Sequence, residues 1–284
     1  MKKIPYIFII LLLAAFVGCD RIEGPYTEIV DQEIVTVDFP DLDVNSVYRK
    51  VLIEEYTGHR CPNCPMGHQK LEELAERFGD TLVAVGIHAG ALAAPTTDLP
   101  YDFRTSVGNE LAQEYSIDGI PAAIINRLPE AGGWSPARWE SKVTAAIRDN
   151  ETLAAVQLIN EYNPILNTIK ANAKVTLLDD YPNALRLAFF IVEDNIVKPQ
   201  INGTDTILDY VHNHVLRASM NGTYGEFLNQ SGYLEENVGY TYAKTMKLDG
   251  TGWNPNNCRV MAILYDKTNS LVLQVEEAPF IKVD

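Results

Sequence analysis

Hydrophobic and polar positions between residues 48 and 150 alternate between short apolar runs and amphipathic stretches. Val51–Thr57 is rich in β-branched, aromatic and aliphatic residues and predicts a buried strand. An amphipathic stripe then predicts a helix that ends near Gly79, with the apolar members Met66, Leu71, Leu74, Ala75 and Phe78. A second apolar strand follows at Thr81–His88. A helix between two such strands predicts a right-handed β-α-β unit with parallel strands.

The rest of this region carries weaker signals. Residues 89–107 show no clear periodicity and are interpreted as an insertion, after which Asn109–Tyr115 predicts a short helix. Pro121 stands at the first position of an apolar strand, where a missing N–H is tolerated. Ser135 and Pro136 form a typical helix start, followed by one apolar face (Trp139, Val143, Ala146 and Ile147).

From Glu151 onwards the pattern changes to strands without intervening helices. The candidate strands are Leu153–Ile159, Ile169–Leu177, Leu185–Ile191, Tyr210–Arg217, Tyr240–Leu248, Val260–Tyr265 and Leu271–Val275. Short strands separated by turn residues predict an antiparallel sandwich of immunoglobulin type. The connection between Ser219 and Asn237 is long for a sandwich, so it holds either a short helix or a binding function.

The N-terminus has the features of a targeting segment. Lys2 and Lys3 precede the apolar run Ile4–Val17, which is shorter than the ~20 residues that a membrane-spanning helix needs. Residues 16–19, Phe-Val-Gly-Cys, resemble a bacterial lipoprotein signal. This resemblance implies removal of residues 1–18 and lipidation of Cys19, which would anchor the protein in a membrane. The alternative is an ordinary secretory signal followed by an unmodified cysteine.

We expect residues 19–46 to form a tether, 47–150 an α/β domain and 151–284 the β-sandwich. The formal charge is −15. That charge argues against nucleic acid as a partner and against electrostatic binding to anionic lipid, so membrane attachment would be covalent.

Cys61 and Cys64 have C-x-x-C spacing and lie where the first strand turns into the helix. Free N–H groups and the helix dipole favour a thiolate at such a position, which makes a nucleophile. Pro62 and Pro65 are tolerated in a first helical turn. The pair is either a redox dithiol or a stable local disulfide. Cys258 stands beside an apolar run and is interpreted as a buried thiol.

Acidic and histidine residues near the cysteines provide further candidates. Glu54 and Glu55 lie in a strand that should be buried, where two carboxylates need a specific reason. His59 and His68 complete the pattern H-x-C-x-x-C-x-x-x-H, a possible copper or zinc set, although His68 is more simply a solvated helix residue. His212 and His214 should share one face of a strand, as a hydrogen-bonded pair or as metal ligands.

The order of strand, C-P-N-C, helix and strand, followed by Gly119-Ile120-Pro121, resembles the thioredoxin fold. In that family the matching proline is cis and faces the cysteines, which implies that Ile120 and Pro121 bind an extended substrate. Cys61 would then attack as a thiolate and Cys64 would resolve the mixed disulfide. Glu55 matches the family's buried proton-accepting acid. If it binds no metal, His59 would stand beside the thiolate, help to stabilise it and contact substrate.

The segments E-E-Y-T-G-H-R-C-P-N-C-P and H-N-H-V-L-R are also similar to the twenty-eight-kilodalton Omp family of outer-membrane lipoproteins of Gram-negative bacteria. The resemblance implies an outer-membrane location and a thioredoxin-like domain before an immunoglobulin-like β-sandwich. We therefore expect an envelope thiol–disulfide oxidoreductase acting on protein or peptide thiols and disulfides, without a cofactor. The alternatives are a non-catalytic binding lipoprotein that uses the fold as a scaffold, and a copper or zinc carrier.

Overall fold

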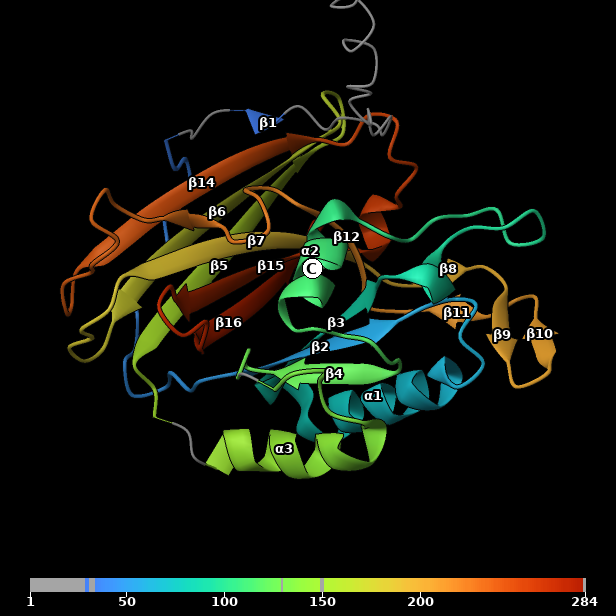
Figure 1. Cartoon of the computed structure of the whole chain (residues 1–284). Helices are drawn as coiled ribbons and strands as arrows, with labels where there is room; N and C mark the ends of the chain where they lie inside the picture. The colour runs from blue at the N-terminus through green and yellow to red at the C-terminus, as the bar shows by residue number, and fades with distance from the viewer. Residues whose placement is uncertain (1–28, 31–33, 129, 149–150, 283–284) are drawn as a thin grey trace, which may run out of the picture.

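The computed structural model describes residues 29–30, 34–128, 130–148 and 151–282 (Figure 1). The predicted signal segment and Cys19 lie outside these residues. The described chain is mostly β, with few helices and with parallel and antiparallel pairing in one sheet.

The first half of the described chain alternates strands and helices. Its elements are β1 (Ile29–Val30), β2 (Val51–Thr57), α1 (Cys64–Phe78), β3 (Leu82–His88), α2 (Ser106–Glu114), β4 (Ala122–Ile125) and α3 (Pro136–Arg148), with short 3-10 turns at Gly79–Thr81 and Ala91–Ala93. Strands β2 and β3 are parallel, and β4 runs antiparallel to β2. The predicted β-α-β unit is therefore confirmed, as is the helix end at Gly79, which caps α1.

Alternation along β2 decides which helices cover each face of the sheet. Val51 and Ile53 pack with side chains of α1 and α3, whereas Leu52 and Tyr56 pack with side chains of α2. Figure 1 shows α1 and α3 together below the sheet. Because side chains of a strand point alternately to its two faces, Glu55 lies on the face of α1 and α3, and Glu54 lies on the face of α2.

Residues 151–282, as the structure describes them, form strands only, apart from one 3-10 turn at Pro255–Asn257. These strands are β5 (Ala154–Asn163), β6 (Thr168–Leu177), β7 (Leu185–Glu193), β8 (Ile196–Val197), β9 (Gln200–Asn202), β10 (Asp205–Ile207), β11 (Val211–His212), β12 (Val215–Ser219), β13 (Glu226–Phe227), β14 (Gly239–Lys247), β15 (Cys258–Asp266) and β16 (Val272–Pro279). A four-stranded sheet, β1-β14-β6-β5, packs on one face of β7, β15 and β16 through a large apolar core.

One sheet joins the two halves of the chain. Its order is β16-β15-β7-β12-β3-β2-β4, with β13 beside β7, so it crosses the predicted boundary between residues 150 and 151. The junction is a parallel pairing of β12 with β3, in which the Gly86 N–H donates to the His214 carbonyl at 2.6 Å. Between β7 and β12 the chain leaves this sheet as the segment β8–β11, which extends beside the start of α1 (Figure 1).

Three local predictions need correction. Helix α1 begins at Cys64, not at Cys61, because Cys61 belongs to the preceding turn. The predicted strand Tyr210–Arg217 is divided into β11 and β12, because His214 adopts a left-handed conformation with φ of 58°. The connection between Ser219 and Asn237 contains strand β13 and no helix.

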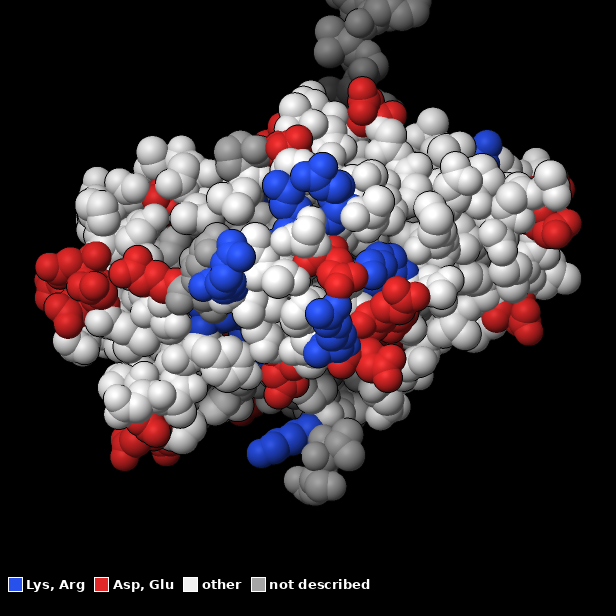
Figure 2. Space-filling view, turned by 90° about the horizontal axis from the view of Figure 1, so that it is seen from below, with Lys and Arg blue, Asp and Glu red and all other residues white. Residues whose placement is uncertain are grey.

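No helix among the described residues is long and apolar enough to cross a membrane. Figure 2 shows acidic and basic side chains intermixed on the face that α1 and α3 cover. Part of this mixture is an ion-pair group in which Lys70 and Arg77 of α1 both contact Glu140 of α3. These helices are therefore joined by charges at the surface and by the apolar core beneath them.

Candidate functional site

The two cysteines of the C-x-x-C motif form a disulfide at the start of α1, with their Cα atoms 5.4 Å apart. Both are buried, whereas Pro62 and Asn63 between them are exposed. Asn63 is the N-cap residue, and its side chain makes no capping hydrogen bond. The backbone N–H groups of the first turn and the positive end of the helix dipole therefore lie next to the sulfur atoms.

Residues 120 and 121 lie opposite the cysteines. The Ile120–Pro121 peptide bond is cis, as the family resemblance implied. The Cys61 Sγ atom lies 3.7 Å from the Ile120 carbonyl oxygen. A Cβ atom placed on Gly67 would lie 2.8 Å from Pro121, so the proline ring lies directly against α1. The sequence thus correctly placed Ile120 and Pro121 beside the cysteine pair.

Strand β9 holds the turn that carries Cys61. The Gln200 side-chain amide donates to the carbonyl of Cys61 at 3.1 Å, and the Ile201 N–H donates to the His59 carbonyl at 2.9 Å. A third bond joins the Gly203 N–H to the Pro62 carbonyl at 2.9 Å. This support comes from a segment about 140 positions away, and no local sequence signal indicated it.

Glu55 is a buried acid, and no described residue forms a hydrogen bond to its Oε1 atom. Burial, with a further contribution from Glu72, raises the pKa of Glu55 well above its usual value, so the protonated carboxyl is favoured. A Cβ on Gly67 would lie 2.8 Å from Glu55 Oε1. Because Cys64 and Gly67 are three residues apart on α1 and both buried, they share the helix face above Glu55. An isolated glycine in a helix was the available signal for this close approach.

Glu54 has a different role from Glu55. Its carboxylate forms a bidentate ion pair with the buried guanidinium of Arg127, at 2.9 Å from Nη2 and 3.1 Å from Nε. Burial alone would lower the pKa of Arg127, but the Glu54 charge outweighs it and raises the pKa. Glu54 is therefore a paired structural charge, which explains one of the two carboxylates that the sequence left without a partner.

His68 connects the buried acid to the outside of α1. Its Nε2 atom is 2.7 Å from the Thr57 hydroxyl and 3.9 Å from Glu55 Oε1, and its Nδ1 atom is 2.7 Å from the Tyr210 hydroxyl. The side chain is only 17% exposed, so the prediction of a solvated helix residue was wrong. Burial lowers the pKa of His68 to about 4, and the imidazole is therefore neutral at pH 7.

His59 is fully buried and packs against the rings of Tyr101 and Phe103. Burial, followed by the charge of Arg60, lowers its pKa to about 4. A neutral, buried ring offers no positive charge to a thiolate of Cys61. The expectation that His59 stabilises that thiolate and contacts substrate is therefore corrected: the ring is part of the packing beneath the turn.

His212 and His214 do not share a strand face, because β11 ends between them. His212 points toward the rings of His88, Phe103 and Tyr210. His214 instead lies 3.6 Å from Glu72 and accepts a hydrogen bond from Arg259. The predicted hydrogen-bonded histidine pair is therefore wrong.

Metal binding is not supported by the side-chain arrangement. Within the residues that the structure describes, no group of three or more His, Cys, Asp or Glu side chains is placed to hold a metal ion. In particular, His68 of the H-x-C-x-x-C-x-x-x-H pattern bonds to Thr57 and Tyr210. Cys258 is a free, buried thiol as expected, and burial raises its pKa to about 12.

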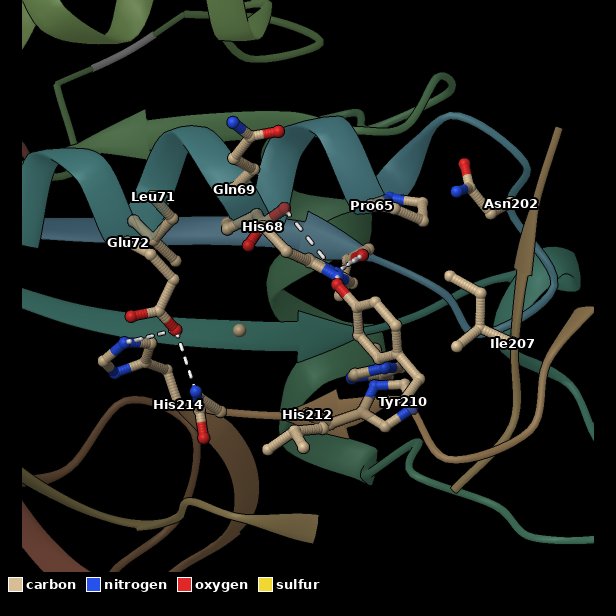
Figure 3. Close-up of a pocket in the computed structure, with 16 residues that line it drawn as sticks. Pro65, His68, Gln69, Leu71, Glu72, Asn202, Ile207, Tyr210, His212 and His214 are labelled. Atoms are coloured by element: carbon tan, nitrogen blue, oxygen red, sulfur yellow. Dashed lines mark hydrogen bonds and ion pairs between the residues drawn. The ribbon is translucent and has the colours of Figure 1, made fainter. Parts of the chain in front are cut away.

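A cavity of about 420 Å³ lies between α1, β3 and the segment β8–β11. Figure 3 shows His68 and Tyr210 pointing toward one another at one end of this cavity and Glu72 with His214 at the other. Glu55, Thr57 and His88 also line it. The cavity therefore reaches the buried acid.

Comparison with known proteins shows the family of this chain and solved structures with a similar fold. A family model described as outer membrane protein Omp28 matches residues 108–282, more than half of the chain. No curated protein matches. The solved structure of HBP35 of Porphyromonas gingivalis is similar, with 16% identity and a TM-score of 0.59, over 82% of this chain and 76% of that chain.

Two further structures are similar to the chain. A protein from Agrobacterium tumefaciens has 11% identity and a TM-score of 0.52, over 84% of this chain and 98% of that one. A domain of the outer membrane lipoprotein Omp28 from Porphyromonas gingivalis has 21% identity and a TM-score of 0.32, over 45% of this chain and 88% of that one. The family match confirms the predicted outer-membrane location in the cell envelope. The chain belongs to the family of the outer membrane protein Omp28.

Proposed function

We propose that this protein is a lipid-anchored thiol–disulfide oxidoreductase of the outer membrane, acting on protein or peptide thiols and disulfides. Its first half is a thioredoxin-like domain, and its second half is an immunoglobulin-like sandwich that positions the site or binds a partner. The anchor is the acyl-modified Cys19 that the signal-like sequence predicts. No cofactor takes part.

The arrangement of the elements supports the thioredoxin-like assignment. Parallel β2 and β3 with antiparallel β4 carry α1 and α3 on one face and α2 on the other. The cysteines stand at the start of α1, with Ile120 and Pro121 beside them. The packing of β5, β6 and β14 against β7, β15 and β16 supports the sandwich assignment.

The observation that carries the proposal is a C-x-x-C pair above a buried carboxyl that has no charged partner among the described residues. Burying an acid without a partner is unfavourable, so such a group indicates a function more often than a structural role. The neighbouring Glu54 shows the structural alternative, since it is neutralised by Arg127.

In the reduced protein, the Cys61 thiolate attacks one sulfur of a substrate disulfide. A bond forms between Cys61 and that sulfur, and the other substrate sulfur leaves as a thiolate. Glu55 then takes the proton of the Cys64 thiol, and the Cys64 thiolate attacks Cys61. The Cys61–Cys64 bond forms, the substrate leaves with two thiols after protonation, and the protein dithiol has been oxidised. The reverse sequence oxidises a substrate dithiol.

In the disulfide form, the raised pKa of Glu55 favours the carboxyl that holds the proton taken from Cys64. The Ile120 carbonyl, next to Cys61, is available to align an extended substrate chain. Glu55 therefore acts as acid and base, and Ile120 with Pro121 binds substrate.

A second candidate is a non-catalytic binding lipoprotein in which the disulfide only closes the turn before α1. The observation in its favour is that Cys61 is 1% exposed and Cys64 is fully buried. Exchange requires that a substrate sulfur reach Cys61, whereas a structural disulfide requires no access.

Trapping separates the two candidates. The reduced full-length Cys64→Ser protein should accumulate a mixed disulfide with a denatured, disulfide-containing model protein, because the resolving sulfur is missing. The adduct is detected on a non-reducing gel, and peptide mass spectrometry should assign it to Cys61. The double variant Cys61→Ser/Cys64→Ser is the control. Absence of an adduct in Cys64→Ser would favour the binding lipoprotein.

A further inference from the structure

The proposed exchange requires Glu55 to lose its proton before each resolution step, because its raised pKa favours the protonated carboxyl and only the ionised carboxylate can take the proton of Cys64. The Glu55 side chain is 2% exposed and lies beneath α1 beside Gly67. A carboxyl in this position can take the proton of Cys64, but it has little direct contact with bulk solvent. A group that lies beside Glu55 and also contacts the wall of the cavity would provide a route outward for the proton.

His68 has the geometry of such a carrier. Its Nε2 atom faces Thr57 and Glu55, both on β2, while its Nδ1 atom faces the Tyr210 hydroxyl (Figure 3). A neutral imidazole accepts a proton at one nitrogen and donates one from the other. The 3.9 Å between Nε2 and Glu55 Oε1 is longer than a hydrogen bond, and catalytic hydrogen bonds are often this long before substrate binds.

Tyr210 continues the chain of groups toward solvent. It lies just before β11, is half-buried and lines the cavity of about 420 Å³. Burial, with contributions from Glu55 and Glu72, raises the pKa of Tyr210 to about 12. Its hydroxyl therefore keeps its proton at neutral pH and can accept one proton while it donates another.

The surrounding charges do not block this route. Glu72 of α1 is held by Asn213 and His214, and these contacts lower its pKa to about 2. His88 of β3 and His212 of β11 also face the cavity, and burial lowers the pKa of both. At neutral pH the side chain of Glu72 is therefore ionised, and the imidazoles of His88 and His212 carry no charge.

We propose that His68 and Tyr210 form a proton path between Glu55 and the cavity, which makes them positioning residues for the proposed exchange. The proton of Glu55 passes to Nε2 of His68, the Nδ1 proton passes to the Tyr210 hydroxyl, and the phenol proton passes to solvent. One proton leaves Glu55, one reaches solvent, and no electrons move. The inference rests on the proposed function, because it assigns a path for the proton that the exchange produces.

The test uses reduced full-length protein and the aromatic disulfide 5,5′-dithiobis(2-nitrobenzoate) in a stopped-flow spectrometer. The first coloured thiolate is released when Cys61 attacks, and the second when Cys64 resolves the mixed disulfide. His68→Ala should leave the first phase unchanged and slow the second by roughly tenfold or more, with an upper limit in the 10²–10⁴-fold range typical of positioned proton transfer. Tyr210→Phe, which removes only the hydroxyl, should slow the same phase.

Two controls separate a proton path from a packing effect. Free imidazole should restore the second phase of His68→Ala but not of Glu55→Gln. Tyr101→Phe removes a phenol that bonds to the Pro199 carbonyl in the same β8–β11 segment, and it should leave both phases unchanged.

The outcomes are distinct. An unchanged second phase in both His68→Ala and Tyr210→Phe, or equal acceleration of His68→Ala and Glu55→Gln by imidazole, overturns the proton path while the proposed function stands. Failure of the reduced wild-type protein to release either thiolate overturns the proposed function and this inference with it.

Discussion

Glu54 and Glu55 are adjacent buried acids, and replacing them by glutamine one at a time should change the free energy of unfolding in opposite directions. Glu54→Gln leaves the buried guanidinium of Arg127 without its counter-charge. Breaking a buried ion pair on one side typically costs about 3–5 kcal/mol of unfolding free energy. For a chain of this size, about 1 kcal/mol lowers the melting temperature by roughly 2–4 °C, so we expect a loss of roughly 6–20 °C.

Glu55→Gln removes a carboxyl that has no charged partner in the part of the chain that the structure describes. The folded-state pKa of Glu55 is raised above its usual 4.5, so its stabilising protonated form is present at low pH. That contribution is lost as the pH rises through the folded-state pKa. The variant should therefore match the wild type near pH 4 and gain in relative stability at higher pH, by at most about 1.4 kcal/mol per pH unit.

The assay is urea unfolding of the disulfide-intact protein at about pH 5 and about pH 8, with Glu54→Gln and Glu55→Gln measured beside the wild type. Each variant is the matched control for the other, because the changes are chemically identical and one residue apart. Equal destabilisation of Glu55→Gln and Glu54→Gln, or a relative stability of Glu55→Gln that falls as the pH rises, would refute an unpaired Glu55 beside a paired Glu54.

Three further predictions concern the same region. Gly67→Ala should lower the urea midpoint, because its Cβ would lie 2.8 Å from Glu55 Oε1, and crowding of about 1–3 kcal/mol outweighs the gain of roughly 1 kcal/mol in helix propensity. The control is Gly119→Ala, whose Cβ would have no described atom within 4 Å. Equal midpoints for the two variants would contradict the close approach of Gly67 to Glu55. Gln200→Ala should cost about 1–3 kcal/mol in the same assay, because buried carbonyls of the turn lose their donor; an unchanged midpoint would speak against that support. The imidazole of His68 should titrate near pH 4 by NMR, and a midpoint near 6.5 would contradict its burial.

Local sequence signals predicted much of the α/β region. The apolar run Val51–Thr57 and the glycine that caps α1 appear where expected, since buried strands and helix ends depend on nearby residues. The cysteine pair and the position of Pro121 were also recognised. The burial of Glu55 followed from its place in a strand covered on both faces.

Contacts between distant segments could not be predicted in the same way. Gln200 and Tyr210 approach the cysteine turn and His68 only because the chain leaves the sheet after β7 and returns at β12. Arg127 follows β4, which pairs with β2, and this pairing brings its guanidinium to Glu54. No residue near either side chain in the sequence indicates this ion pair. The alternation that placed two histidines on one strand face failed because His214 adopts a left-handed conformation.

The central claim is that Cys61 is a reactive thiolate, and its pKa tests that claim most directly. The rate at which iodoacetamide alkylates the reduced protein would be followed against pH, with the label assigned to the Cys61 peptide by mass spectrometry. Because Cys61 lies beside the N-terminal turn of α1, we predict a half-maximal rate at a pH well below the ordinary thiol value of about 8.5. A half-maximal rate near pH 8.5 would contradict the account.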